Sequence, residues 1–138
     1  MNNFPNNQFV QMLGIMALGD LGYLNKKNQN EILEKKGIET IINSMNNFTN
    51  NQGIQFYGCE TLKDIISFDQ RNENEIMKLK GIETIIKSMN NFPNIQQIQK
   101  NGCQILGNLS FQNEKIQNEI VENKGIETII KLMNNFPK

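Results

Sequence analysis

The sequence lacks histidine and tryptophan altogether and contains only two cysteines among its 138 residues. Without histidine, the chain has neither the usual general base nor the commonest protein ligand for metals. The two thiols, Cys59 and Cys103, therefore have no imidazole to activate them as nucleophiles, and two cysteines do not make a disulfide framework. These absences predict a protein that is not an enzyme and that holds no metal, cofactor or small-molecule substrate.

An excess of charge of one sign and long apolar runs are missing as well. The 14 basic residues balance the 14 acidic ones, whereas nucleic-acid binders normally carry a basic excess, because phosphate neutralisation supplies much of their affinity. No stretch approaches the ~18 consecutive apolar residues of a membrane helix, and the N-terminus lacks the pattern of a secretory signal. We expect a protein of the cytoplasm, with the nucleus as an alternative, that binds neither nucleic acid nor membrane.

Asparagine, in contrast, is abundant, with 24 residues, many of them in pairs. Such a bias is usual in disordered or aggregation-prone segments. Here, however, isoleucine, leucine, methionine and phenylalanine recur between the asparagines at fixed spacing. The asparagines are therefore expected in the turns and on the solvent-exposed faces of a folded chain.

The chain repeats itself every 44 residues. Residues 37–48 return at 81–92 and again at 125–136, with a single substitution at each step. One methionine marks the register throughout: Met1, Met45, Met89 and Met133. A fixed period of this length without insertions indicates a repeat protein.

Each repeat contains two short helical segments. In the first, 28–33, Asn28 and Glu31 have the spacing of a capping box. Glycine is expected to end this segment in a left-handed conformation in every copy, at Gly37, Gly81 and Gly125. The second segment, 38–45, places its apolar residues on one helical face.

The third helical segment is the longest and spans about 6–22, 50–67 and 94–110 in the three copies. A glycine lies in its middle each time: Gly14, Gly58 and Gly102. Glycine inside a helix costs about 1 kcal/mol relative to alanine. Its recurrence therefore predicts a neighbouring helix that packs too closely for a Cβ atom.

The third copy carries a recognisable set of short motifs: Ile98-Gln99, Gly102, 105–110, 120–122 and Gly125-Ile126. These motifs resemble the armadillo-repeat pattern of V-Q, a small residue, A-L-x-N-L-S, I-V-E and G-G-I-P, and the resemblance extends over essentially the whole chain. It implies an all-α fold, a right-handed α-solenoid of about three three-helix repeats; a HEAT-like α-α superhelix is the alternative. We expect a single repeat domain, 1–138, with units 37–80 and 81–124 and partial units 1–36 and 125–138.

The resemblance also implies that the third helices line a concave groove for extended partner polypeptides. In the nuclear-import receptors of this family, a tryptophan and an asparagine form ladders along that groove. The tryptophan position falls at Met16, Glu60 and Gln104, and the asparagine position at Asp20, Asp64 and Asn108. Since only the last of these six matches, the sequence argues against binding of nuclear-localisation signals.

Steps of four residues along the third helices give the candidate groove residues: Met12, Met16, Asp20, Phe56, Glu60, Asp64, Lys100, Gln104 and Asn108. Three carboxylates among them, Asp20, Glu60 and Asp64, form an acidic patch suited to a basic peptide, whereas Lys100 opposes it. The methionines and the phenylalanine indicate a contact surface if they are exposed. The alternative is that these residues form the solvated face of an ordinary scaffold.

The terminal helices are unusually apolar for the ends of a repeat stack, which should be polar outside. Residues that would form an oligomer interface lie at both ends: Phe9, Met12, Met16, Tyr23, Leu24, Ile129, Leu132 and Met133. We expect a non-catalytic scaffold that binds partner proteins or peptides through its groove or its terminal helices. The alternative is a structural repeat protein that assembles with itself, head to tail or through an N-terminal-helix dimer; a longer repeat array, whose next unit covers the same surface, would explain the apolar ends equally well.

Overall fold

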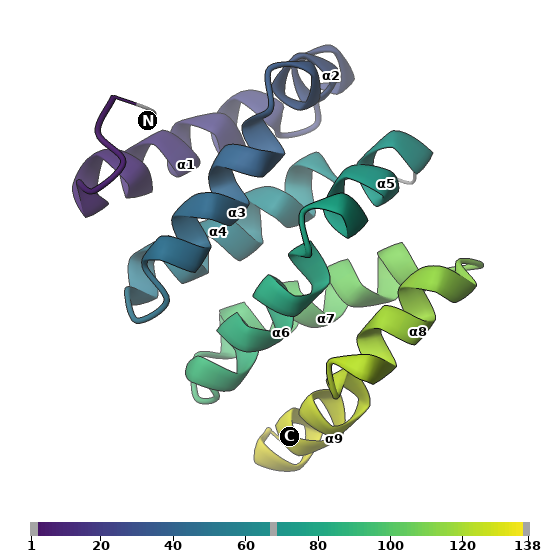
Figure 1. Ribbon diagram of the computed structural model, residues 1–138. Coiled ribbons are helices and arrows are strands. Elements are labelled where there is room, and N and C mark those ends of the chain that lie inside the picture. The colour runs from purple at the N-terminus through teal and green to yellow at the C-terminus, as the bar shows by residue number, and fades with distance from the viewer. Residues whose placement is uncertain (1–2, 67–68, 137–138) are drawn as a thin grey trace.

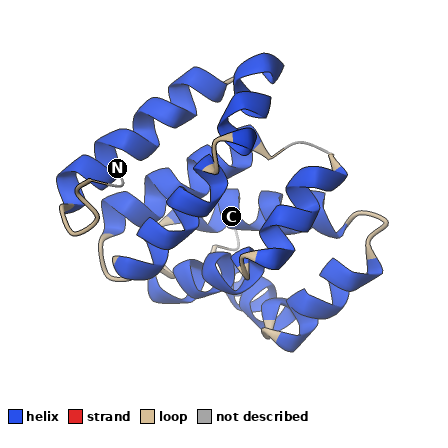
Figure 2. Ribbon diagram, turned by 45° about the horizontal axis from the view of Figure 1, so that its top comes forward, coloured by secondary structure: helices blue, strands red, loops and turns tan. Residues whose placement is uncertain are grey.

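The computed structural model describes residues 3–66 and 69–136, and over these ranges the chain forms helices and turns, without strands. Within these ranges nine helices follow one another: α1 (Gln8–Gly22), α2 (Lys26–Glu34), α3 (Gly37–Asn47), α4 (Gln52–Ile65), α5 (Gln70–Lys78), α6 (Gly81–Asn91), α7 (Gln96–Ser110), α8 (Glu114–Glu122) and α9 (Gly125–Asn135). Short loops join them (Figure 2). The prediction of an all-α repeat fold is confirmed.

The helices recur with the 44-residue period of the sequence. Helices α2, α3 and α4 return as α5, α6 and α7, and α8 and α9 begin a further copy, while α1 corresponds to α4 and α7. In Figure 1, equivalent helices lie side by side in three rows: α1, α4, α7; α2, α5, α8; and α3, α6, α9. Because the chain advances by one position in each row per repeat, its two ends lie at opposite ends of the stack.

The core runs along the stack between these rows and consists mainly of isoleucine. Ile41 and Ile85, at the same position of α3 and α6, are completely buried, as are Ile54 and Ile98 in α4 and α7. Burial of one such side chain stabilises the fold by about 1.5–3 kcal/mol. No single unit is thick enough to bury both faces of its helices, so each copy depends on the next.

The short helices α2, α5 and α8 begin at a side-chain cap, three residues before the expected position. The Asn25 side chain accepts a hydrogen bond from the N–H of Asn28 at 3.0 Å, and Asn113 accepts one from Ile116 at 3.1 Å. Asp69 caps α5 in the same way. The predicted capping box at Asn28 is therefore wrong, because Asn28 already lies inside the helix, and its own N–H is one of the groups that need a cap.

The predicted left-handed glycine is also wrong. The residue with positive φ is the preceding lysine, with φ of 61° at Lys36, 55° at Lys80 and 59° at Lys124, and none of the described glycines has positive φ. Gly37 instead begins α3, where a Cβ atom would lie 2.5 Å from Ile32 Cγ2. Glycine is required here by the close approach of the two helices, and the turn itself is made by lysine.

The long helices start two residues later than expected, at Gln8, Gln52 and Gln96. The side chains of Asn7 and Asn51 cap the first two. Helix α4 ends at Ile65; Ser67, where the sequence placed its end, lies outside the described residues.

Two of the three recurring mid-helix glycines, Gly58 and Gly102, mark close contacts, as predicted. A Cβ atom on Gly58 would lie 2.6 Å from Met45 Sδ, and one on Gly102 would lie 2.5 Å from Met89 Sδ. A glutamine three residues earlier fixes each contact: Gln55 Nε2 donates to the carbonyl oxygens of Met45 and Phe48, at 2.8 and 2.9 Å. Gln99 makes the equivalent pair of bonds in the next copy. The glutamine of the V-Q motif thus holds the second and third helices of each repeat together.

Candidate protein-binding surfaces

The first candidate surface lies between α1 and α4, which pack against each other along the row of long helices. A hollow of about 460 Å³ opens there, and four predicted groove residues line it: Met16, Asp20, Glu60 and Asp64. Tyr23, predicted for the oligomer interface, lines it as well. The fold thus brings together residues that four-residue steps along the two helices had singled out.

Four further residues of the hollow were not predicted: Gly19, Tyr57, Thr61 and Lys63. Tyr57 lies three residues before Glu60, so helical spacing could have indicated it. Lys63 Nζ lies 3.3 Å from Asp64 Oδ1. The three carboxylates are thus offset by one ammonium group, and the hollow carries two net negative charges at neutral pH.

The apolar residues predicted for the groove are partly buried against the rest of the fold. Met12 and Phe56 pack against the edge of the core. Met12 Sδ lies 2.6 Å from where a Cβ atom on Gly53 would be, so this methionine covers α4. The Phe56 ring meets that of Tyr57 edge-on, with centroids 5.0 Å apart. Met12 and Phe56 are thus half-buried, and neither is among the residues that line the hollow.

The predicted groove residues on α7 lie apart from this hollow. Lys100 and Gln104 are exposed and Asn108 is half-buried. None of these three lines the space between α1 and α4. The described structure thus brings together the groove residues of the first two long helices, and Lys100 does not oppose the acidic patch directly.

The second candidate surface is the N-terminal end of the stack. Phe9, Tyr23 and Leu24, three of the residues predicted for an oligomer interface, are exposed there. The sequence missed Leu21, which is 58% exposed although its counterpart Leu109 in α7 is 1% exposed. A hollow of about 570 Å³ opens beside it between α1, α2 and α3 and is lined by Gly14, Ala17, Leu18, Leu21, Asn28, Glu31, Ile32, Lys35, Gly37 and Thr40. The equivalent residues Leu21, Ile65 and Leu109 are all apolar, so comparing the three long helices in the sequence gives no sign of this face.

The third candidate surface is the C-terminal end, formed by α8 and α9. Of the residues predicted there, Met133 is 63% exposed, whereas Ile129 and Leu132 pack partly against the core. The sequence missed Ile126 and Ile130, which are about half exposed. Their counterparts in α6 are buried, so this end also presents apolar side chains that are covered elsewhere in the molecule.

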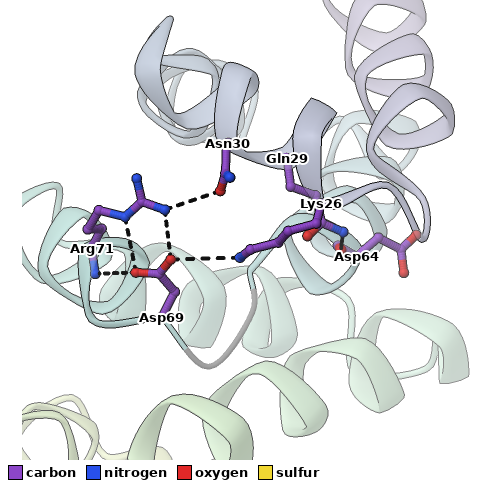
Figure 3. A network of polar contacts seen from close by, with 6 residues as sticks. All are labelled: Lys26, Gln29, Asn30, Asp64, Asp69 and Arg71. Atoms are coloured by element: carbon purple, nitrogen blue, oxygen red, sulfur yellow. Dashed lines mark hydrogen bonds and ion pairs between the residues drawn. The ribbon is translucent and has the colours of Figure 1, made fainter.

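A polar network joins the first two short helices (Figure 3). Arg71 Nη2 donates to Asp69 Oδ2 at 2.9 Å and to Asn30 Oδ1 at 3.1 Å, while Lys26 Nζ lies 3.7 Å from the same carboxylate. Hydrogen bonds from the Arg71 side chain and backbone lower the pKa of Asp69 to about 2. Gln29 donates to the carbonyl oxygen of Asp64 at 3.1 Å. The network ties α2 to α5 and belongs to the junction between copies.

The two cysteines are free thiols in different surroundings. Cys59 is fully buried, with its Sγ 3.8 Å from the Ser88 hydroxyl, and burial raises its pKa to about 11. Cys103 is only half-buried, and desolvation raises its pKa. Raised pKa values keep both side chains protonated, which disfavours nucleophilic chemistry.

Within the described ranges, no group of three or more metal-ligating side chains comes together. The same part of the chain has no helix that is both long and apolar enough to cross a membrane.

A family model described as "LRRK2 ARM repeat" matches residues 1–138. No curated protein and no solved structure matches significantly.

Proposed function

The chain belongs to the LRRK2 ARM repeat family, and from this premise we propose that it is a scaffold whose α1–α4 hollow binds a basic, extended segment of a partner polypeptide. Armadillo repeats are a non-catalytic fold and generally bind proteins. One observation carries the finer proposal: Asp20, Glu60 and Asp64 converge on a single hollow beside two tyrosines and a methionine. Carboxylates attract lysine and arginine, and the aromatic rings offer cation-binding faces. The division into units 37–80 and 81–124 with a partial unit at each end is part of this proposal.

A titration with two synthetic peptides tests this function. The probes are a peptide of alternating lysine and glycine and its glutamate counterpart, measured by calorimetry at low and moderate salt. We expect only the lysine peptide to bind, with an affinity that falls as salt rises. Glu60→Lys should weaken binding about tenfold, because it replaces an attraction with a repulsion worth roughly 1.4 kcal/mol in total.

The matched control is Glu83→Lys, which makes the same charge change at an exposed position of α6, outside the hollow. It should leave the affinity within about twofold of the unmodified chain, since a distant surface charge is screened. Equal binding of both peptides, or an equal loss in the two variants, would contradict the proposal.

A second candidate function is structural: the chain assembles with further copies of itself through its terminal helices. The observation that favours it is the exposure of apolar side chains at both ends of the stack, Leu21 at one and Met133 at the other. Exposed apolar patches of this kind usually mark contact surfaces. Sedimentation velocity over a range of protein concentrations distinguishes an assembling chain from a monomer.

A further inference from the structure

The second helices of neighbouring copies are joined by a contact that occurs twice within the chain. The Cδ1 atom of Ile42 in α3 lies 3.1 Å from where a Cβ atom on Gly81 in α6 would be. One repeat later, Ile86 Cδ1 lies at the same distance from the corresponding point on Gly125 in α9. The absence of a side chain at each glycine therefore leaves room for an isoleucine methyl group from the preceding copy.

Two more contacts accompany the isoleucine each time. Met45 and Met89 fill the space above Gly58 and Gly102, respectively, in the long helix that follows. The asparagine after each methionine accepts a hydrogen bond from the next second helix: Thr84 Oγ1 donates to Asn46 Oδ1 at 2.9 Å, and Thr128 Oγ1 donates to Asn90 Oδ1 at 3.0 Å. We call the isoleucine, methionine and asparagine of one copy the plug. The two glycines and the threonine that they contact are the socket.

The 44-residue period places a third socket at the N-terminal end, made of Gly14, Gly37 and Thr40. All three residues line the 570 Å³ hollow between α1, α2 and α3. The three atoms nearest to a Cβ position on Gly37 all belong to Ile32, the third of them at 3.5 Å, so no isoleucine from another copy approaches as it does at Gly125. Among the described residues, this socket contains no plug.

The same period places a third plug at the C-terminal end, made of Ile130, Met133 and Asn134. Ile130 is 54% exposed, whereas its counterpart Ile86 is 3% exposed, and Met133 contrasts with the buried Met89 in the same way. Asn134 is exposed as well. Over the described residues, the chain therefore presents a complete plug and a socket whose isoleucine position is unfilled, with the chemistry of an interface that it already makes twice internally.

We propose that α9 of one copy docks in the N-terminal socket of a second copy, head to tail. In this arrangement Ile130 packs over the partner's Gly37, Met133 packs over the partner's Gly14, and Asn134 accepts a hydrogen bond from the partner's Thr40. The inference rests on the second candidate function, self-assembly, and specifies its interface. Because plug and socket are different surfaces, each pairing leaves one of each unused, and growth continues until a ring closes or a filament forms.

The N-terminal segment competes with docking. Gln11 Nε2 donates to the carbonyl oxygen of Phe4 at 3.0 Å, as Gln55 does to that of Phe48. An incoming α9 brings the Phe136 carbonyl to the same position, since Phe4 and Phe136 are equivalent in the repeat. Residues around Phe4 must therefore move aside, and we expect the intermolecular contact to be weaker than its two internal counterparts.

Two variants of the full chain separate plug from socket. Met133→Glu places a charge on the plug, and Ala17→Arg places one in the lining of the socket; both side chains are exposed, so neither change disturbs the core. The controls are Asn43→Glu and Asn43→Arg, which introduce the same residue types at an exposed position of α3. Sedimentation velocity from low to high micromolar concentration is the measurement.

We expect the unmodified chain and both controls to form a series of growing assemblies and each surface variant to remain monomeric. A mixture of the two variants should form dimers and nothing larger, because the intact socket of one binds the intact plug of the other and both remaining ends are blocked. This result is specific to a head-to-tail contact between unlike surfaces.

Two other outcomes overturn the inference. If the unmodified chain assembles and Met133→Glu assembles equally well, the interface is a different one, for example an N-terminal-helix dimer. The head-to-tail contact is then rejected, and only the more general proposal of self-assembly is retained. If the unmodified chain is a monomer throughout, self-assembly fails too. Peptide binding at the α1–α4 hollow is measured separately and is unaffected by either outcome.

Discussion

Helices α6 and α9 have nearly the same sequence and very different surroundings. Both span eleven residues, and they differ only where Ser88 is replaced by Leu132. Yet Ile82 is fully buried in α6, whereas Ile126, its equivalent in α9, is half exposed. The comparison shows that the local sequence determines the helix, while burial of its apolar face is determined by the neighbouring copy.

The largest expected effect comes from truncating the same methionine in both places. Met89→Ala should lower the free energy of unfolding by about 2–5 kcal/mol, because it opens a cavity above Gly102 in the core. Met133→Ala should change it by less than about 0.5 kcal/mol, since the side chain is mostly in solvent. Urea denaturation at a concentration where the chain is monomeric measures both, and equal losses would show that α9 is covered by something in the same molecule.

A smaller effect is expected from two glycines of α7. Gly102→Ala brings a Cβ atom against buried Met89, and overpacking of this kind costs about 1–3 kcal/mol, reduced by the roughly 1 kcal/mol gain in helix propensity. At Gly107 nothing lies within 4 Å of the added atom, so the gain of about 1 kcal/mol from the same substitution remains. Thermal unfolding of the two variants should therefore shift in opposite directions; a shared direction would mean that the close approach at Gly102 costs little.

The smallest expected effect distinguishes the two junctions between short helices. At the α2–α5 junction, hydrogen bonds from Arg71 lower the pKa of Asp69 from 3.8 to about 2. A lowered pKa in the folded state stabilises the fold above pH 3.8, and this contribution is lost as pH falls toward 2. Asp69→Asn should remove that part of the acid sensitivity while keeping the cap on α5. The change is modest because the pair is exposed to solvent.

The α5–α8 junction provides the comparison for this acid titration. There Asn113 Nδ2 donates to Glu73 Oε2 at 2.7 Å, and no arginine takes part among the described contacts. Asp69→Asn should therefore leave this second junction unchanged. Acid denaturation followed by circular dichroism provides the measurement, and an identical profile for Asp69→Asn and the unmodified chain would contradict the assignment.

The sequence predicted the number, order and period of the helices because these follow from local spacing of apolar residues. It also predicted the contact at Gly58, since a glycine that recurs in mid-helix needs a structural reason. The start of α2 was misplaced because Asn25 and Asn28 are both acceptable caps, and only the backbone path shows which one lies outside the helix. The role of Gly37 was missed because its neighbour Ile32 is fixed by packing and not by spacing.

The candidate surfaces were predicted in part for a related reason. The acidic hollow emerged from the sequence because Asp20, Glu60 and Asp64 follow simple four-residue steps along two helices. The exposure of Leu21 and Ile130 did not emerge from the sequence, because the sequence of an apolar helix face is the same whether or not another helix covers it. Whether it is covered depends on an additional copy, which is information that lies outside the repeat unit itself.

The lysines that precede each second helix have a consequence for the backbone. In the left-handed region a side chain costs about 1–2 kcal/mol, and the armadillo pattern has a glycine where this chain has Lys36, Lys80 and Lys124. The lysine at this bend is therefore slightly strained in every copy. Its side chain is charged and exposed to solvent. Since the strain is repeated with each unit, it accumulates in proportion to the length of the array.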